Sequence, residues 1–289
     1  MKIEMIKNET MAAHTTWQIG GPTKYYAQVT DPVELGEALA IASDLNAPVF
    51  MIGNGSNLLV GDKGFDGMVI KLRGNFTGLH IKHNVIVAEA GVKLATIVNV
   101  ARERSLEGMA FAAGIPGTVG GAVVMNAGAL DGSISDIIET VTIYNPQGEV
   151  GVLGSTEFRF GYRVTDVKNK GIVLGASFRL EQGDPHEVTR QIVDALDRKR
   201  RTQPLEARTA GSVFKNPPRK HAAALIEEAG CKGMKIGGAV VSRMHANFII
   251  NVGGATAYDV LRLIDEVAAT VKNKTGVELE REVELVGEF

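Results

Sequence analysis

The alternation of apolar and polar positions predicts a chain of mixed helices and strands. Asp31-Pro32-Val33-Glu34 places a capping side chain, a proline and an acid before apolar positions at helical spacing, so we expect a helix to about Asn46. Asp184-Pro185-His186-Glu187 repeats this order and predicts a second long helix. Thr256 and Gly276 are typical of the start and the end of a third. Further helices are expected at 94–104 and 220–229.

Short apolar runs predict the strands between these helices. We expect them at 49–52, 58–60, 68–72, 85–89, 137–144, 148–153, 172–174, 177–180, 246–250 and 277–286. Asn145-Pro146-Gln147 separates two of these runs and is typical of a hairpin turn. The order of elements predicts an α+β protein with a larger first region, to about residue 183, and a smaller second one.

Composition and charge exclude several classes of protein. The 289 residues are 45% hydrophobic and 22% charged, which is typical of a globular protein. Lys and Arg number 31 against 33 acidic residues, so a nucleic-acid-binding surface is not expected. Cys231 is the only cysteine and the histidines lack metal-ligand spacing, so we expect neither an internal disulfide nor a metal site.

We expect neither a secretory signal nor a membrane-spanning segment in this sequence. Charged residues interrupt the apolar positions of the N-terminus, which argues against a secretory signal and favours the cytoplasm. Residues 108–130 carry no charge and are long enough to span a bilayer. They also contain six glycines, Pro116 and Asn126, which disfavour a membrane helix. Backbone packed closely around a ligand explains this stretch better.

Two glycine-rich loops suggest where that ligand binds. Gly53-Asn54-Gly55-Ser56-Asn57 follows a strand and can present successive N–H groups to an anion such as a pyrophosphate. It is not a Rossmann fingerprint, because Leu58 stands where the third glycine would be and a strand follows. Taken alone, this loop is explained equally well by an ordinary tight turn. A second loop at 114–128 places glycines where backbone can pack against a ring or a phosphate, and two such loops suit a dinucleotide.

These loops, together with Thr16-Trp17-Gln18-Ile19-Gly20-Gly21, resemble the FAD-binding half of the UDP-N-acetylenolpyruvoylglucosamine reductases. Phe160-Gly161-Tyr162-Arg163 and the segments 210–217 and 279–283 resemble later motifs of that family, so the resemblance covers nearly the whole chain. It implies a fold of the p-cresol methylhydroxylase/vanillyl-alcohol oxidase type. The expected parts are an N-terminal segment (1–20), an FAD-binding domain of two α+β subdomains (21–183, boundary near 75) and a substrate-binding domain (184–289).

The resemblance also implies the reaction and its residues. We expect non-covalent FAD, NADPH as reductant and a UDP-sugar enolpyruvyl ether as substrate, with no membrane and no obligatory protein partner. The implied catalytic residues are Arg163, Ser212 and Glu282. The implied FAD contacts are Gly53, Asn54, Gly55, Ser56, Asn57, Leu58, Gly114, Ile115, Pro116, Gly117, Thr118, Gly120, Gly121, Asn126 and Gly128. The implied substrate contacts are Tyr162, Lys199, Asn216 and His245.

The chain departs from the pattern of some relatives at two places. Residues 164–171 lack the longer tyrosine-bearing insertion of some relatives, so the chain resembles the shorter subgroup and must close on its substrate with other residues. His245 stands where some relatives have glutamine.

The residue types suit the implied chemistry. Arg163 stays protonated and offers a planar set of donors to the negative charge that develops on an enolpyruvyl carboxylate. The Ser212 hydroxyl is acidic enough to protonate a strongly basic carbon. Glu282 assists only when protonated or paired with a cation.

Simpler explanations and other functions stay open at this point. Arg163 alone would more often be a surface residue, and Glu282 a solvated position on an alternating strand. The basic run 198–201 would complement a helix C-terminus, and we cannot tell which of its cations contacts the diphosphate. At the level of function, a flavin-dependent oxidase of the same fold and a non-redox module that binds a nucleotide sugar are the alternatives.

Overall fold

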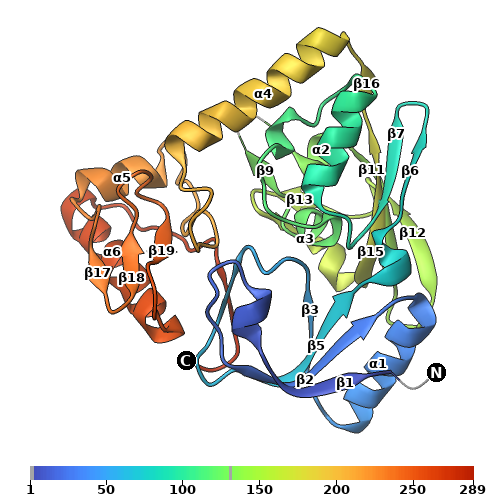
Figure 1. Ribbon diagram of the computed structural model, residues 1–289, viewed down its shortest axis with the longest axis horizontal. Helices are drawn as coiled ribbons and strands as arrows, with labels where there is room; N and C mark the ends of the chain where they lie inside the picture. Colours follow the sequence, from blue (N-terminus) through green and yellow to red (C-terminus); the bar gives the residue numbers. More distant parts are fainter. Residues whose placement is uncertain (1–2, 130–131) are drawn as a thin grey trace. The chain divides into compact units, whose positions relative to one another are not determined.

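The computed structural model describes residues 3–129 and 132–289 and divides the chain into two compact units (Figure 1). Unit 1 comprises Met1–Met5, Tyr26–Asn54 and Val69–Lys199. Unit 2 comprises Ile6–Tyr25, Gly55–Met68 and Arg200–Phe289. Each unit has its own core of buried apolar side chains. The helix that begins at Pro185 belongs to unit 1 as far as Lys199, and the expected division into domains stays a prediction.

Unit 1 contains a five-stranded antiparallel sheet covered by helices. The sheet has the strand order β12-β11-β15-β7-β6, and α3 packs on β7 and β15. The bounds of these elements are β6 (Leu79–Lys82), β7 (Val85–Glu89), β11 (Ile138–Tyr144), β12 (Val150–Gly154), β15 (Ile172–Arg179), α2 (Leu94–Glu103) and α3 (Val119–Val124). The apolar face of α2 buries Leu94, Ile97 and Val98, as its spacing predicts.

A second sheet carries the chain from one unit to the other. Its order is β1-β2-β5-β3, and the divisions between units fall inside three of its strands. The strands are β1 (Met5–Thr10), β2 (Pro22–Val29), β5 (Phe65–Leu72) and β3 (Val49–Ile52). The chain therefore contributes an N-terminal piece and a 14-residue piece, Gly55–Met68, to unit 2 before its C-terminal part begins.

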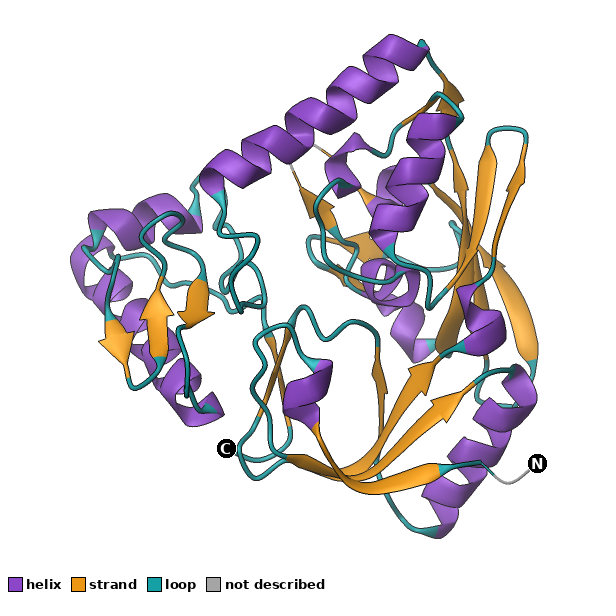
Figure 2. Cartoon of the chain, viewed as in Figure 1, coloured by secondary structure: helices purple, strands orange, loops and turns teal. Residues whose placement is uncertain are grey.

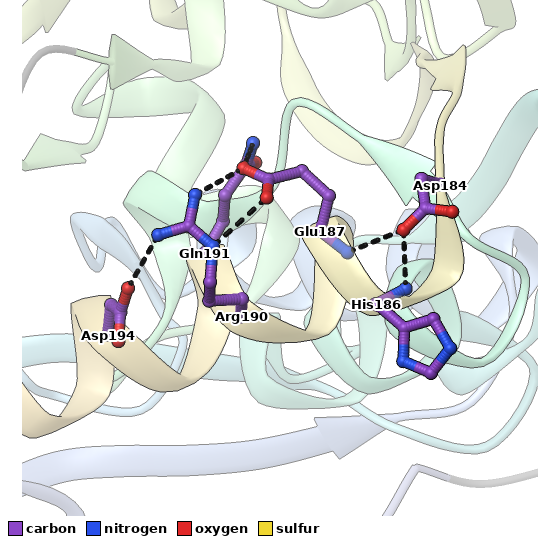
Figure 3. Close-up of polar contacts among 6 residues, drawn as sticks. All are labelled: Asp184, His186, Glu187, Arg190, Gln191 and Asp194. Carbon is purple, nitrogen blue, oxygen red and sulfur yellow. Dashed lines mark hydrogen bonds and ion pairs between the residues drawn. The ribbon is translucent and has the colours of Figure 1, made fainter.

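Two long helices begin directly after the aspartates that were predicted to cap them. Asp31 accepts hydrogen bonds from the N–H groups of Val33 and Glu34 ahead of α1 (Pro32–Asp44). Asp184 does the same for His186 and Glu187 ahead of α4 (Pro185–Thr202), as Figure 3 shows. In its first turns, α4 adds exposed ion pairs from Arg190 to Glu187 and Asp194. Such pairs stabilise a helix by a few tenths of a kcal/mol, roughly.

Unit 2 combines a small antiparallel sheet with two helices (Figure 2). The helix α6 begins after Thr256 as expected, with a capping box between Thr256 and Asp259, and Gly276 ends it in the left-handed conformation. Trp17 is fully buried in this unit and its indole N–H donates to the carbonyl of Ile249 at 2.8 Å. The elements are β17 (Lys235–Ile236), β18 (Ala239–Val241), β19 (Ile249–Asn251), α5 (Ala222–Glu228), α6 (Ala257–Thr275) and the parallel pair β4 (Leu58–Val60) and β20 (Glu284–Val286).

The remaining elements are short. They are β8 (Leu106–Glu107), β9 (Gly128–Ala129), β10 (Gly132–Ser133), β13 (Phe160–Gly161), β14 (Val164–Thr165), β16 (Glu181–Gln182) and the 3-10 turns η1 (Met11–His14), η2 (Gly74–Thr77), η3 (Ala110–Ala112), η4 (Ile134–Asp136) and η5 (Asp166–Asn169). Among the helices of the described residues, none is both long enough and apolar enough to cross a membrane.

Three expectations about local structure were wrong. The strand expected at 277–286 is confined to β20, because 277–283 runs beside irregular backbone and not beside a regular strand. The runs at 172–174 and 177–180 are one strand, β15, which continues through Gly175. The glycine-rich stretch contains a helix, α3, although glycine disfavours helices. Leu130 at the end of that stretch lies outside the described residues, as do Met1 and Lys2 of the N-terminal segment.

Candidate active site

The loop at 53–57 fits the diphosphate of a dinucleotide. Among the described residues, the backbone N–H groups of Asn54, Gly55 and Ser56 have no acceptor, so three donors remain available at this turn. A Cβ added to Gly53 would stand only 2.6 Å from the hydroxyl oxygen of Thr118. The absence of a side chain at Gly53 therefore lets the two glycine loops approach closely in unit 1. Gly55 has φ of +61°, a conformation that favours glycine. Free N–H donors on successive residues are what a bound phosphate requires.

The glycines of the second loop serve two purposes. Gly120 packs on β7, since a Cβ there would stand 3.0 Å from that of Ala90. Gly128 is similarly confined by the carbonyl of Gly132, at 2.5 Å from an added Cβ. A Cβ on Gly121 would instead meet nothing nearer than 3.8 Å, and this residue is exposed at the start of α3. Tight packing within the protein thus explains some of these glycines, and only an open position such as Gly121 leaves backbone free to contact a ligand.

Other predicted cofactor contacts have structural tasks of their own. The side chain of Ile115 packs against the core of unit 1, and the carbonyl of Gly117 accepts a hydrogen bond from Leu94. Leu58 begins β4 and pairs with Glu284. Pro116 is exposed. Their contact with FAD stays a prediction.

Lys199 places a buried cation beneath the start of the second loop. The residue is 4% exposed, and its ammonium donates hydrogen bonds to the carbonyls of Phe111 and Ala113. Its stem also limits Gly114, where an added Cβ would stand 3.1 Å from Lys199 Cδ. Burial, and secondarily the charge of Arg163, lower the pKa of Lys199 to about 8. The predicted contact of Lys199 with a diphosphate stays a prediction, because these two carbonyls are the partners that the structure shows.

Arg163 lies on a short hairpin in unit 1. Strands β13 and β14 pair at Gly161 and Val164, so Tyr162 and Arg163 form the turn between them. The backbone of Arg163 has φ of +60°, which is unusual for a residue other than glycine. Its guanidinium donates to the carbonyl of Gly128 at 2.6 Å and lies 4.8 Å from the centre of the Tyr162 ring. A cation is therefore held at the end of the second glycine loop.

Ser212 and Glu282 lie on neighbouring backbone segments of unit 2. The Glu282 N–H donates to the carbonyl of Val213 at 2.8 Å, and Ser212 bridges to Phe248 on its other side. Asn57 joins this group, because its amide donates to the Glu282 carbonyl at 3.1 Å. The structure thus brings Ser212 and Glu282 together within one unit. Arg163 belongs to unit 1, and its joint action with them stays a prediction.

Asn247 holds the segment that carries Ser212. This side chain is 4% exposed and pairs with both backbone groups of Phe214, accepting from its N–H at 2.9 Å and donating to its carbonyl at 2.8 Å. The carbonyl of Asn247 also accepts from Val213. A side-chain amide therefore takes the place of a neighbouring strand along this irregular segment.

Two buried polar atoms near this segment have no partner among the described residues. They are the hydroxyl of Thr209 and Nδ1 of His245. The His245 ring lies 4.7 Å from that of Phe248, and burial, followed by the charge of Lys232, lowers the pKa of His245. An unpaired buried polar atom is costly in a folded protein, so both atoms are suited to meet a ligand or a water molecule. The side chain of Asn216, another predicted substrate contact, already has a partner in the structure: its amide oxygen accepts a hydrogen bond from the N–H of Ala222 at the start of α5.

Comparisons with known proteins match both halves of this arrangement. A family model described as an FAD binding domain matches residues 23–154, and one described as the C-terminal domain of UDP-N-acetylenolpyruvoylglucosamine reductase matches 203–286. Relatives with that reductase name are 44% identical in Caldanaerobacter subterraneus (97% of this chain, 93% of that protein) and 42% in Moorella thermoacetica (100% and 95%). The chain belongs to the UDP-N-acetylenolpyruvoylglucosamine reductase family.

A crystal structure of the reductase from Thermus caldophilus agrees over 99% of both chains, with a TM-score of 0.85 at 36% identity. The family resemblance and the α+β FAD-binding fold expected from the sequence are therefore confirmed. The FAD-binding model covers both glycine loops, and the reductase C-terminal model covers Ser212 and Glu282. Arg163 and Lys199 fall between the two matched ranges, so their roles depend on the geometry described above.

Sequence reasoning missed Asn247 and the partners of Lys199. Met244-His245-Ala246-Asn247 drew attention through its histidine alone. Nothing in that segment shows that Asn247 reaches Phe214, which is 33 residues earlier. The one available signal was the position of Asn247 inside the apolar run 246–250, because an asparagine in such a run is expected to be buried and then needs hydrogen-bond partners.

We expect Asn247→Ala to destabilise unit 2. The substitution leaves two buried backbone groups of Phe214 unpaired, at about 1–3 kcal/mol each. The midpoint of urea unfolding, with Asn99→Ala on the exposed surface of α2 as the matched control, measures the effect. A variant as stable as wild type would show that these hydrogen bonds are dispensable.

We expect the stability of wild type to rise with pH through the range in which Lys199 titrates, and Lys199→Met to lack this part of the rise. The folded pKa of about 8 lies below the ordinary value of 10.5. Between these values the unfolded chain binds more protons than the folded one, so raising the pH favours the folded chain, by up to about 3 kcal/mol.

Urea unfolding of both proteins at about pH 7 and about pH 10 measures this difference. Lys63→Met removes an exposed lysine and serves as the control. The same change with pH in wild type and in Lys199→Met would contradict the assignment of Lys199 as a buried cation.

Proposed function

We propose that this chain reduces the enolpyruvyl group of UDP-N-acetylglucosamine enolpyruvate to give UDP-N-acetylmuramate, with FAD as cofactor and NADPH as reductant, in the synthesis of peptidoglycan precursors. The observation that carries the proposal is the full-length match to reductases of that name, combined with a diphosphate-compatible loop next to the predicted catalytic segment. The substrates are small molecules, and the absence of an obligatory protein partner stays a prediction.

The fit of FAD rests on residues described above. The N–H groups of Asn54, Gly55 and Ser56 would hold its diphosphate, and the uncovered backbone at Gly121 would leave space beside Thr118. When bound, FAD accepts a hydride equivalent from NADPH and supplies it to the terminal carbon of the enolpyruvyl double bond. We expect the two substrates to use the same entrance in turn, so that no separate nicotinamide fold is needed.

Arg163 is proposed to bind the enolpyruvyl carboxylate. Negative charge develops on the carbon next to that carboxylate as hydride reaches the terminal carbon, and a guanidinium offers two parallel donors to it. The hydrogen bond to Gly128 and the contact with Tyr162 restrict where this cation points. A positioned cation stabilises the transition state without first having to reorganise solvent.

Ser212 is proposed to complete the reduction by proton transfer. Its hydroxyl proton goes to the carbon that carries the carboxylate, so the double bond gains one hydride and one proton. The serine alkoxide then regains a proton from solvent. A carbanion of this kind is basic enough to accept a proton from a hydroxyl. Asn247 and Glu282 hold the adjacent backbone and thereby fix the position of this donor.

Glu282 and the substrate contacts complete the proposal. Glu282 lies on the backbone beside Ser212 and Asn57, where its carboxyl group is suited to support the proton donor. Tyr162, Lys199, Asn216 and His245 are proposed to contact the sugar nucleotide. The side-chain amide oxygen of Asn216 also accepts a hydrogen bond from the N–H of Ala222 at the start of α5.

Reductase activity can be separated from the two alternative functions by the flavin spectrum. Under anaerobic conditions, we expect NADPH to bleach the bound flavin and the enolpyruvyl nucleotide to restore its colour. A flavin that NADPH cannot reduce, or that only oxygen can reoxidise, would favour an oxidase. Protein that stays colourless after addition of FAD would favour a non-redox binding module.

We expect Ser212→Ala to slow only the oxidative half-reaction. Loss of a positioned proton donor typically costs about 10²–10⁴-fold, while hydride transfer from NADPH does not involve this hydroxyl. Stopped-flow absorbance measures the two half-reactions separately, and Ser43→Ala, at an exposed position on α1, is the control. Equal slowing of both half-reactions would refute the role of Ser212 as proton donor.

A further inference from the structure

Asn126, at the end of the second glycine loop, uses both ends of its side-chain amide within unit 1. The residue is 6% exposed and has φ of +41°, a left-handed conformation that asparagine tolerates better than most residues. Its amide nitrogen donates to the carbonyl of Gly161 at 3.0 Å, and its amide oxygen accepts from the N–H of Ser135 at 2.9 Å. This side chain therefore has little capacity left for a cofactor, although a contact with FAD was expected.

The partner of this amide is part of the Arg163 hairpin. Gly161 pairs with Val164 across the turn that contains Arg163. The segment that begins at Asn126 also reaches the arginine directly, because the carbonyl of Gly128 accepts from its guanidinium at 2.6 Å. Two residues of the glycine loop, Asn126 and Gly128, thus hold the hairpin at its backbone and at its charged end.

The conformation of Arg163 makes such support necessary. A non-glycine residue in the left-handed region is strained and persists only where surrounding contacts determine it. The guanidinium in turn depends on the direction that this backbone imposes. A shift of the hairpin by about 1 Å would misplace a catalytic group enough to cost a large factor in rate.

We propose that Asn126 is a positioning residue for Arg163, which couples the FAD-binding loop to the site where the substrate carboxylate is bound. This inference rests on the proposed function, in which Arg163 binds that carboxylate. Only an amide meets both partners at this place. An aspartate would set an oxygen against the Gly161 carbonyl, and an alanine would leave two partly buried backbone groups without this partner.

The test compares two nucleotides that differ in the carboxylate. UDP-N-acetylmuramate carries the lactyl carboxylate and UDP-N-acetylglucosamine does not, so calorimetric Kd values for the two ligands report how well Arg163 is placed. We expect Asn126→Asp and Asn126→Ala to weaken binding of the first about 10-fold or more, as loss of a charged hydrogen bond does, and to leave the second unchanged.

A double variant separates positioning from a general loss of structure. Arg163→Ala should abolish the preference for the carboxylate, and adding Asn126→Asp to it should cause no further loss. Asn84→Ala, which removes an amide that donates to the carbonyl of Leu180 elsewhere in unit 1, should keep the wild-type preference. The flavin content of every variant is measured alongside. Equal weakening of both ligands, or loss of flavin in parallel with the preference, would overturn the inference.

Hydrogen exchange tests the same link without any substrate. Amides of residues 160–165 should exchange faster in Asn126→Asp than in wild type, while those of 85–89 in β7 should not. If exchange at 160–165 is unchanged, the inference fails whatever the binding data show. Wild-type protein that binds neither nucleotide would instead contradict the proposed function, and the exchange result would still decide whether Asn126 holds the hairpin.

Discussion

A buried asparagine that pairs with main-chain groups is the interaction on which the candidate site depends. Asn126 does this for the segment that carries Arg163, and Asn247 for the segment that carries Ser212. Strand pairing in both segments is short, a two-residue ladder beside Arg163 and isolated bridges beside Ser212, so other groups must satisfy much of their backbone. A side-chain amide supplies one donor and one acceptor in fixed geometry, as a neighbouring strand would. Each unit thus fixes a reactive side chain on backbone that is free to take an unusual conformation.

Electrostatics impose a second constraint on unit 1. Lys199 and Arg163 place two cations near the same loop, and burial makes the lysine charge unfavourable. The carbonyls of Phe111 and Ala113 partly compensate, since they accept its hydrogen bonds. A bound dianionic group would compensate further. The cost of this buried cation in the ligand-free protein is therefore consistent with a site organised around negative charge.

Local signals in the sequence predicted the helices well, and long-range pairing limited the rest. Caps at Asp31, Asp184 and Thr256 act over three residues, so α1, α4 and α6 begin where their motifs indicate. Apolar and polar residues alternate along 277–286, as they do in a strand with one buried face. A strand also needs a neighbouring strand to pair with, and most of this segment lacks one. The helix α3 was missed because glycine signals turns more often than helices.

The site was predictable to a similar extent. The glycines alone pointed to its two loops as a ligand site, whereas the catalytic roles of Arg163, Ser212 and Glu282 were predicted only from the family resemblance. The hydrogen bond of Asn126 to Gly161 was not predicted, because Gly161 lies 35 residues away in the sequence. Packing tasks and binding tasks of glycine also look alike in a sequence, and Gly120 and Gly121 differ only in what surrounds an added Cβ.

The charge state of unit 2 suits a proton donor without charge of its own. Burial and Lys232 lower the pKa of His245, so its imidazole is neutral at neutral pH and keeps one nitrogen as an acceptor. In the proposed reaction, a cation near Ser212 would lower the basicity of the carbon that this serine protonates, and an anion would repel the nucleotide diphosphate. A neutral histidine avoids both effects. Burial thus leaves the imidazole of His245 uncharged and its Nδ1 without a partner among the described residues.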